Sequence, residues 1–343
     1  MKCLAIADML LAIKDFDDAL KGCDLFKEYE AIYWPIGETR ADFRNVIRRL
    51  ETLGSKAYEP SPEVMEKIKD IECLFIHQHP VSAEMIAAAP NLKFIISARG
   101  GVENIDVDAA RQRGVHVINC PAHNAVAVAE YCIGLMLCEM RNIARADKAL
   151  RKGEWREFYP NSECIGELSD AVIGLVGFGT IGRLVAERIK PFGSEVIVYD
   201  PYISDDDAKN NGVRKVELKE LLTTADVVSL HGRIPAGSPP LIGEGELKQM
   251  KPSAYLINTA RAVLLDMKAL AQALKNKTIK GAAIDVFPTE PLPQGDPLLG
   301  IDEITLTNHR GGDTYNCFAK APVLLVKQFR EYISTGKTRF LVV

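Results

Sequence analysis

AVIGLVGFGTIG, at residues 171–182, is an apolar run that passes directly into a glycine-rich loop. The run predicts a buried strand, and the residues after the loop predict a helix at Arg183–Lys190. Gly177 permits a tight turn, Gly179 lets a ligand approach the backbone, and Gly182 lets the helix pack closely on the strand. The helix N-terminus presents N–H donors and a positive dipole. We therefore expect a diphosphate to bind here.

A carboxylate follows the next predicted strand. Asp200 stands eighteen residues after Gly182, at the end of the strand Glu195–Tyr199. A carboxylate at this place accepts a hydrogen bond from a ribose 2′-hydroxyl and repels a 2′-phosphate, so the pattern favours NAD over NADP. The alternative is a glycine turn and a strand-end aspartate that bind no ligand.

Short apolar runs alternate with amphipathic stretches on both sides of this segment, which is typical of βαβ units around parallel sheets. The first series of predicted strands comprises Lys2–Ala7, Ala31–Pro35, Cys73–His77, Phe94–Ser97 and Val115–Asn119. The second series comprises Ala171–Val176, Glu195–Tyr199, Val227–Leu230, Ala254–Asn258, Gly281–Asp285 and Ile304–Thr307. The sequence thus predicts an α/β protein with two Rossmann-like, doubly wound parallel-sheet domains.

Two long helical patterns decide how the chain divides. Ala122–Arg151 reads as one helix that connects the two series, and Tyr315–Thr335 reads as one long helix after the last strand. The second helix needs a surface to pack on, and we expect it to return to the first domain. Residues 122–312 are then the NAD-binding domain, and residues 1–121 with 313–343 form a discontinuous substrate, or catalytic, domain.

Composition excludes several classes of protein. The 343 residues suit two domains of roughly 100–200 residues each. The 42 basic and 46 acidic residues give a net charge of −4, which offers no basic footprint for nucleic acid. The apolar stretch Ala125–Met140 carries Glu130 and Glu139, so we expect no membrane span. The eight cysteines are scattered without a CxxC pair, which favours reduced thiols in a cytoplasmic protein.

Three ionisable residues stand just beyond strands of the second series. Arg261 follows Ala254–Asn258, Glu290 follows Gly281–Asp285, and His309 follows Ile304–Thr307. Ligands of open α/β sheets bind outside the carboxyl ends of the strands, so all three side chains can reach one crevice. Taken singly, each is also explained as a surface cation, a turn residue or a loop histidine.

The chain resembles the D-isomer-specific 2-hydroxyacid dehydrogenases, a family that includes phosphoglycerate, glycerate and D-lactate dehydrogenases. The resemblance spans most of residues 94–312. Its matching segments are GGVENID (100–106), VINCPAHNAVAVAE (117–130), GLVGFGTIG (174–182), VIVYDPY (196–202), MKPSAYLINTAR (250–261), GAAIDVFPTEPL (281–292) and TNHRGG (307–312).

The resemblance implies a role for each of the three residues. Arg261 pairs with the carboxylate and 2-oxygen of the substrate, His309 is the acid/base at that oxygen, and Glu290 supports His309. The chemistry agrees independently, because removing hydride from an alcohol carbon needs a base for the hydroxyl proton, and histidine suits that task near neutral pH. Arginine offers a planar fork that matches a carboxylate.

The resemblance also implies the remaining contacts. Thr180 and Ile181 lie at the diphosphate. Thr259 and Ala260 lie beside the nicotinamide and Asp285 lies at its carboxamide, unless Asp285 is only a strand-end cap. The glycines that complete the cofactor set are Gly311 and Gly312. The loop Arg99, Gly100, Gly101 and Val102 presents backbone N–H groups to the substrate carboxylate, unless it is a plain turn.

Several positions depart from the family pattern. Asn308 replaces the usual proline before His309, Ala262 replaces the glycine after the arginine, and Arg310 replaces a small apolar residue. Arg310 either binds a second acidic group of the substrate or faces solvent. Phosphoglycerate dehydrogenases tend to carry arginines after the third strand, where this chain has His77-Gln78-His79. We expect no metal at this HxH, because no third ligand suggests itself.

These observations predict an NAD-dependent dehydrogenase that interconverts a D-2-hydroxy acid and a 2-oxo acid. The alternatives are a nicotinamide-responsive binding protein of the corepressor kind, a formate dehydrogenase of the same fold, or specifically a 3-phosphoglycerate dehydrogenase. The apolar residues of Ala122–Arg151 favour a homodimer contact, as the resemblance also implies, although burial inside the monomer explains them equally. These residues are Val126, Val128, Ile133, Leu135 and Leu137.

Overall fold

The structure is a computed structural model that describes residues 1–121, 123–235, 237–338 and 340–343. The chain divides into two compact units. The first contains Met1–Asn124 and Thr314–Val343, and the second contains Ala125–Asp313. Each unit holds one parallel sheet, so the predicted fold class is confirmed, including the discontinuity of the first domain. Ala122, where one predicted helix begins, lies outside the described residues.

The first unit is built on a five-stranded sheet with the order β2-β1-β3-β4-β5. All its neighbouring strands pair in parallel, and Ala5 pairs with Ala31 on one side and Phe75 on the other. The strands are β1 (Lys2–Ala7), β2 (Glu28–Tyr33), β3 (Cys73–Ile76), β4 (Phe94–Ser97) and β5 (His116–Ile118). These strands lie within a few residues of their predicted positions.

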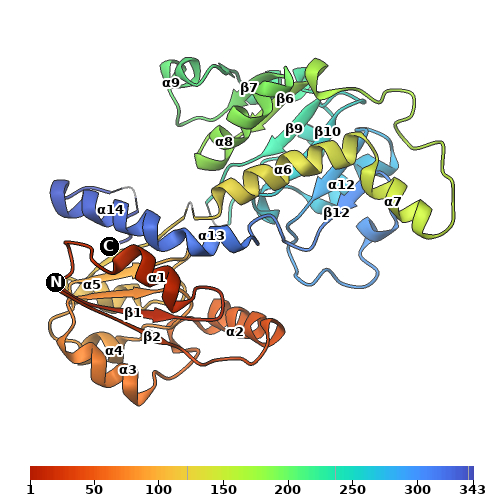
Figure 1. The fold of residues 1–343 in the computed structure, drawn as a ribbon. Coiled ribbons are helices and arrows are strands. Elements are labelled where there is room, and N and C mark those ends of the chain that lie inside the picture. Colours follow the sequence, from red (N-terminus) through yellow and green to blue (C-terminus); the bar gives the residue numbers. More distant parts are fainter. Residues whose placement is uncertain (122, 236, 339) are drawn as a thin grey trace. The chain divides into compact units, whose positions relative to one another are not determined.

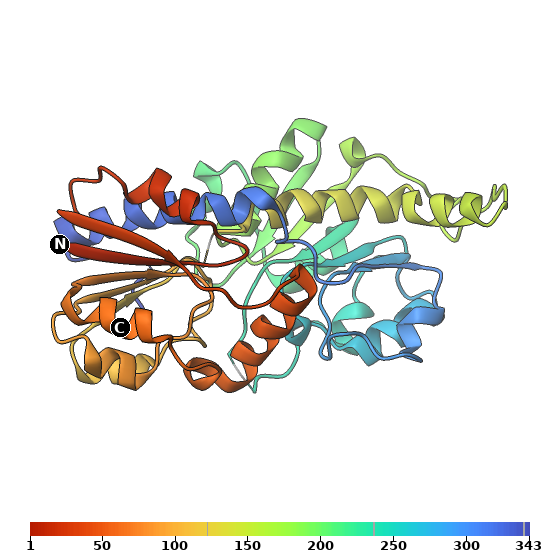
Figure 2. The same cartoon turned by 60° about the horizontal axis from the view of Figure 1, so that its bottom comes forward.

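Helices cover both faces of this sheet because alternate strand residues are apolar on both sides. Ala5 faces one core with α1 (Ile13–Leu20) and α14 (Ala321–Thr335), which run side by side in Figures 1 and 2. Ile6 faces the other core, with four further helices. These helices are α2 (Arg40–Leu53), α3 (Pro62–Lys67), α4 (Ala83–Ala88) and α5 (Val107–Gln112). In α14, Phe329 stacks on Phe26 with ring centroids 6.1 Å apart, which ties the returning segment to the first unit.

The second unit is built on a seven-stranded sheet with the order β12-β11-β10-β9-β6-β7-β8. Its strands are β6 (Val172–Val176), β7 (Glu195–Tyr199), β8 (Arg214–Lys215), β9 (Val227–Leu230), β10 (Tyr255–Asn258), β11 (Gly281–Ile284) and β12 (Ile304–Leu306). Strand β8 was not predicted, because two residues carry no periodicity. The strand order reverses between β6 and β9, and ligands of doubly wound sheets bind outside the strand ends at such a switch point.

Helices again lie on both faces. Helices α6 (Ala125–Met140) and α8 (Thr180–Ile189) share one core with the strands, and α10 (Leu218–Thr224), α11 (Glu244–Leu247) and α12 (Met267–Lys275) share the other. The second unit also contains α7 (Ile143–Arg151) and α9 (Asp205–Asn210), whereas α13 (Tyr315–Ala319) belongs to the first unit. Short 3-10 turns occupy Gly54–Lys56, Ile68–Asp70, Leu168–Asp170, Lys190–Phe192, Ala262–Leu264 and Pro297–Gly300.

Two predicted helices are each broken, so both predictions are corrected. The segment 122–151 is interrupted at Asn142, whose φ of 57° is left-handed and whose Nδ2 donates to Asn161 Oδ1 at 2.6 Å. The segment 315–335 is interrupted at Lys320, and Pro322 lies in the first turn of α14. Proline suits a first turn because it has no N–H to lose there.

The sequence left open whether the apolar side chains of α6 are buried inside the monomer or form a dimer contact. Ile133 and Leu135 are buried in the core of the second unit, and Leu137 packs against it. Val126 is exposed. Burial inside the monomer therefore explains Ile133 and Leu135 without a dimer contact.

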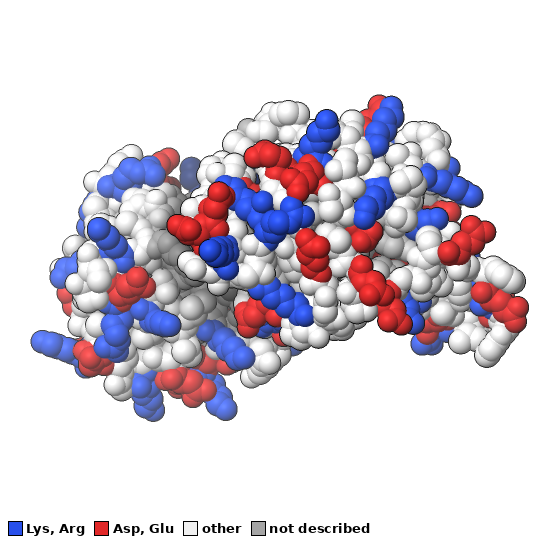
Figure 3. Space-filling view, turned by 90° about the horizontal axis from the view of Figure 1, so that it is seen from above, with Lys and Arg blue, Asp and Glu red and all other residues white. Residues whose placement is uncertain are grey.

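None of the described helices is both long and apolar enough to cross a membrane. On the face drawn in Figure 3, basic and acidic side chains lie interspersed.

Candidate active site

The glycine loop of the second unit lies at the switch point, between β6 and α8. Gly177 has a φ of +100°, and a Cβ there would lie 2.5 Å from the backbone nitrogen of Gly232. A Cβ on Gly182 would overlap the carbonyl oxygen of Gly177. Gly179 is different, because it precedes the first turn of α8 and a Cβ would meet nothing within 4 Å. Two glycines thus shape the loop and the third leaves its surface open.

Asp200 is fixed at the edge of this loop. Its Oδ2 accepts a hydrogen bond from the Phe178 backbone N–H at 2.7 Å, and its Oδ1 accepts one from Tyr202 N–H at 2.8 Å. The carboxylate therefore stands beside the glycine loop in one orientation. An open backbone surface, a helix N-terminus and a fixed carboxylate fit the diphosphate and ribose of NAD. Thr180 and Ile181 form the first turn of α8, which begins three residues before the predicted helix Arg183–Lys190.

His309 and Glu290 meet at the carboxyl edge of the same sheet. His309 Nδ1 lies 2.8 Å from Glu290 Oε2, and the other carboxylate oxygen accepts the Phe287 backbone N–H at 2.9 Å. The His309 side chain is 51% exposed, so its ring is open to a ligand. An Nδ1–H that donates to the carboxylate leaves Nε2 available for proton exchange.

Asp285 holds the loop that carries His309. Its Oδ1 accepts from the Thr307 hydroxyl at 2.6 Å and from Arg310 N–H at 2.9 Å, and its Oδ2 accepts from Gly311 N–H at 2.9 Å. The carboxylate is 1% exposed. These bonds fix both sides of His309, whose φ of 56° lies in the left-handed region. Asp285 therefore shapes the histidine loop, in addition to the predicted contact with a carboxamide.

Arg261 leaves the carboxyl end of β10, two strands from β12. The loop is shaped by buried Asn258, whose Nδ2 donates to Arg261 O at 3.0 Å and whose Oδ1 accepts from Ala260 N–H at 3.0 Å. The Arg261 side chain is exposed, and its Nη1 donates to Ala260 O at 2.7 Å. Strand order thus brings the arginine to the same sheet edge as Glu290 and His309.

Two buried polar atoms at this edge also fit a nicotinamide nucleotide. The Thr259 hydroxyl has no nitrogen or oxygen partner among the described residues, and the same is true of His231 Nδ1. His231 follows β9, and its Nε2 lies 2.9 Å from the Ser229 hydroxyl. Burial lowers the pKa of His231 to about 4, so the ring is neutral at pH 7. Unpaired donors and acceptors are costly to bury, which suits atoms that a ligand contacts.

Sequence reasoning missed His231 and Asn258. Both carry the signal that pointed to Arg261, Glu290 and His309, since each is a polar residue at or just after the carboxyl end of a predicted strand. Gly311 is buried against Asp285, and Gly312 follows it in the same loop. The predicted cofactor glycines 311 and 312 therefore lie in the loop that Asp285 holds.

The remaining predicted residues lie in the first unit. Arg99, Gly100, Gly101 and Val102 follow β4, at the carboxyl edge of that sheet. Asn104 joins this loop to the residues after β3, because its Nδ2 donates to His77 O at 3.2 Å and to His79 O at 2.9 Å. Hydrogen bonds of Asn104 therefore connect the loops after β3 and β4 at the carboxyl edge of this sheet.

The two histidines of the HxH pattern lie beyond the end of β3 and have different partners. His77 Nδ1 lies 2.9 Å from Asp8 Oδ2, whereas the His79 ring packs edge-on against Trp34. Burial lowers the pKa of His79 to about 4. No group of three or more metal-ligating side chains gathers among the described residues.

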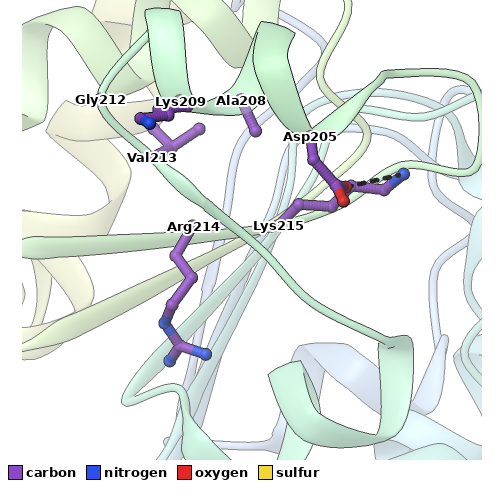
Figure 4. A pocket seen from close by; sticks show the side chains of 7 residues that line it. All are labelled: Asp205, Ala208, Lys209, Gly212, Val213, Arg214 and Lys215. Atoms are coloured by element: carbon purple, nitrogen blue, oxygen red, sulfur yellow. Dashed lines mark ion pairs between the residues drawn. The ribbon is translucent and has the colours of Figure 1, made fainter.

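Two surface hollows lie elsewhere and contain none of the predicted site residues. Figure 4 shows one of about 380 Å³ beside α9 and β8, where Asp205 and Lys215 form an ion pair at 3.7 Å. The other, of about 480 Å³, lies along α2 and is lined by Arg40, Arg44 and Arg48.

Comparison with known proteins decides the family. The family model described as "D-isomer specific 2-hydroxyacid dehydrogenase, NAD binding domain" matches residues 133–311. A glyoxylate reductase of Korarchaeum cryptofilum is 37% identical over 253 residues, which are 73% of this chain and 76% of that protein. The chain belongs to the D-isomer specific 2-hydroxyacid dehydrogenase family. Its second unit contains the NAD-binding domain of the family, as predicted.

Other relatives differ in length or in sequence. A D-3-phosphoglycerate dehydrogenase of Methanocaldococcus jannaschii is 38% identical over 274 residues, which are 79% of this chain but 51% of that protein. The chain thus spans about half the length of that relative. A D-isomer specific 2-hydroxyacid dehydrogenase from Lactobacillus delbrueckii ssp. bulgaricus, solved with NAD, has a TM-score of 0.77 at 20% identity. The alignment covers all of both chains, and the likeness concerns the fold alone.

Proposed function

We propose that this protein is an NAD-dependent dehydrogenase that interconverts a D-2-hydroxy acid and a 2-oxo acid. The observation that carries the proposal is the His309–Glu290 pair, 2.8 Å apart, at the sheet edge that also carries the glycine loop and Asp200. The family of the chain supports it.

Each of the three ionisable residues of the second unit has one task in this proposal. His309 Nε2 takes the proton of the 2-hydroxyl group in oxidation and returns it to the 2-oxo oxygen in reduction. Glu290 holds Nδ1–H, fixes the tautomer and stabilises the imidazolium that forms. Arg261 binds the carboxylate and the 2-oxygen of the substrate through its planar fork. NAD, when bound, supplies the hydride acceptor at C4 of its nicotinamide.

The cofactor is held by the loop and strand ends already described. Gly179, Thr180 and Ile181 face the diphosphate, and Asp200 accepts from the ribose. Thr259 and Ala260 lie at the nicotinamide. In the first unit, the N–H groups of Arg99, Gly100, Gly101 and Val102 bind the substrate carboxylate, which makes this unit the substrate domain.

We propose a substrate without a phosphate group. Arg310 Nη1 is 2.5 Å from Asp313 Oδ2, so this guanidinium already has an anionic partner. His79 is neutral near pH 7 because burial lowers its pKa to about 4. Neither residue therefore offers a ready positive charge to a phosphate. A small 2-oxo acid such as glyoxylate or hydroxypyruvate fits these surroundings better than phosphohydroxypyruvate.

The test is NADH oxidation with a panel of 2-oxo acids: glyoxylate, hydroxypyruvate, pyruvate, 2-oxoglutarate and phosphohydroxypyruvate. The control variant is His309→Asn, because asparagine tolerates a left-handed φ better than alanine does. We expect the turnover rate to fall by about 10²- to 10⁴-fold in the variant, because a general acid or base usually contributes this factor to the rate. No turnover with any acid, while NADH still binds, would indicate a nicotinamide-responsive binding protein instead.

We also propose that the protein forms a homodimer through the segment that follows α6. Four large apolar side chains are exposed there: Ile143 (55%), Leu150 (57%), Trp155 (81%) and Phe158 (78%). Contiguous exposed apolar side chains mark interaction surfaces. The dimer contact is proposed at this segment and not at the predicted α6 residues Ile133 and Leu135, because those two are buried in the core of the second unit.

A further inference from the structure

Arg99 is a buried cation in the loop after β4. The residue is 8% exposed, and its Nη1 has no hydrogen-bond partner among the described residues. Burial lowers the pKa of the guanidinium, because the charged form loses its hydration. A buried guanidinium with an unpaired N–H donor can bind an anion, since a buried charge needs a partner of opposite sign.

A carboxylate of the chain itself already lies at this site. Glu103 Oε2 is 3.4 Å from Arg99 Nη2, and Glu51 Oε1 is 4.0 Å from the same nitrogen. A Cβ on Gly101 would overlap the Glu103 carboxylate, with Oε1 at 2.6 Å. The Glu103 carboxylate therefore rests against the Cα of Gly101, on the loop that is proposed to receive the carboxylate of the substrate.

We propose that Glu103 is a displaceable internal carboxylate that competes with the substrate carboxylate for the Arg99–Val102 loop and thereby sets the KM. The inference rests on the proposed function, because it uses the same loop. It adds a specificity-determining residue that the strand-end rule did not indicate, at Glu103 of the matching segment GGVENID (100–106).

The geometry favours displacement over a permanent ion pair. The Glu103 side chain is 51% exposed, and its contact with Arg99 is a single long one rather than a bidentate fork. Only the Glu103 partner of this pair is exposed, and one contact at 3.4 Å holds its carboxylate weakly. A substrate carboxylate at Gly101 would stand beside a second negative charge, and like charges repel at this range. Glu103 must therefore rotate into solvent as the substrate binds.

The variant Glu103→Gln removes the charge and keeps the size of the side chain. With NADH and glyoxylate, we expect the KM to fall by about threefold to tenfold, the range of a half-exposed charge contact, and kcat to stay within about twofold. The matched control is Glu51→Gln, which removes the other carboxylate near Arg99 Nη2 from an exposed position on α2. Its KM is expected to stay within about twofold of the wild type.

A structural role for Glu103 gives a different result. If Glu103 only holds Arg99 in place, Glu103→Gln raises the KM or leaves it unchanged, and either result overturns the proposal. Glu103→Asp is the second variant should the first fold poorly, because its shorter side chain withdraws the carboxylate from Gly101. It is expected to lower the KM by a smaller factor.

A binding measurement separates this inference from the proposed function. Oxalate is titrated by calorimetry into the NADH complexes of the wild type and of Glu103→Gln. Tighter binding of oxalate to the variant supports the internal carboxylate even if no 2-oxo acid is turned over, in which case only the proposed function fails. Equal or weaker binding of oxalate overturns the inference even if the wild type is an active dehydrogenase.

Discussion

Glu290 accepts one hydrogen bond on each carboxylate oxygen, from His309 Nδ1–H and from the Phe287 backbone N–H. In Glu290→Gln only one oxygen remains to accept, and the charge that is proposed to stabilise the imidazolium is lost. We expect kcat with the best 2-oxo acid to fall by about 10- to 100-fold. NADH affinity, measured by fluorescence titration, is expected to stay unchanged, because Glu290 touches the histidine rather than the cofactor. A fall in NADH affinity that matched the fall in kcat would contradict this role.

Asp200 is the residue that we propose selects the cofactor. Both of its carboxylate oxygens are bound to backbone N–H groups, so it cannot turn away from a 2′-phosphate. In Asp200→Ser the repulsion disappears and the hydroxyl still reaches a backbone donor. We expect the ratio of kcat/KM for NADPH over NADH to rise by about 10- to 100-fold, as removal of one unfavourable charge contact predicts. A ratio that stays at the wild-type value would place the ribose elsewhere.

The predictable part of the site follows from one rule, that ligands lie beyond the carboxyl ends of parallel strands. The rule found Arg261, Glu290 and His309, and the structure brings the last two into contact. It could not show that Asp285 would hold the histidine loop, because that depends on which N–H groups the loop turns inward. It gave no sign of Glu103 either, since the place of an exposed side chain depends on the turn before it.

At the scale of elements, strands were easier to predict than helix breaks. A strand buried on both faces is a short apolar run with clear ends, and β1, β4, β7 and β9 have their predicted bounds. Helical periodicity instead continues across Asn142, where the backbone is left-handed, and across Lys320, which separates α13 from α14. A break stabilised by the contact of Asn142 with distant Asn161 leaves no trace in local periodicity.

The glycine loop allows a test with matched variants. Gly177→Ala must accept a positive φ and a clash with the backbone of Gly232, so we expect the free energy of unfolding to fall by roughly 3 kcal/mol or more. Gly182→Ala is expected to cost roughly 2 kcal/mol, because its Cβ would overlap Gly177 O. Gly179→Ala meets open space and should change stability by less than about 0.5 kcal/mol.

The same three variants separate stability from cofactor binding. Chemical denaturation gives the free energies of unfolding, and fluorescence titration gives the NADH affinity. Gly179→Ala is expected to lose NADH affinity while its stability is kept, because its Cβ stands where the diphosphate approaches the backbone. Unchanged NADH affinity in Gly179→Ala would show that the diphosphate does not approach at this position.

For the molecule as a whole, the exposed apolar segment after α6 makes a prediction about assembly. Trp155 and Phe158 are both more than three-quarters exposed, which is costly unless a second copy covers them. We expect a dimer by light scattering, and a monomer for Trp155→Lys combined with Phe158→Lys. Val323→Lys in the first unit, at an exposed apolar position of α14, is the control and is expected to leave the mass unchanged. A wild-type protein that is monomeric by light scattering would contradict the proposed dimer.

The stability of the whole molecule should depend on pH through its buried histidines. Burial lowers the pKa of His79, His123 and His231 to about 4, whereas an unfolded histidine titrates near roughly 6.5. Between these values the unfolded chain binds more protons, so the free energy of unfolding falls as the pH falls from 7 to 5. At pH 5 the loss is up to about 2 kcal/mol for each histidine.

Two buried carboxylates act differently. The pKa of Asp8 is lowered, because His77 and backbone N–H groups outweigh the effect of burial, so its contribution is lost only in stronger acid. Burial raises the pKa of Glu139 despite Arg145, so it opposes the histidines slightly. Denaturant midpoints at pH 7, 6 and 5 should therefore decline, and His79→Phe should flatten the slope. A midpoint that stays constant from pH 7 to 5 would show that these rings are protonated or solvated in the folded protein.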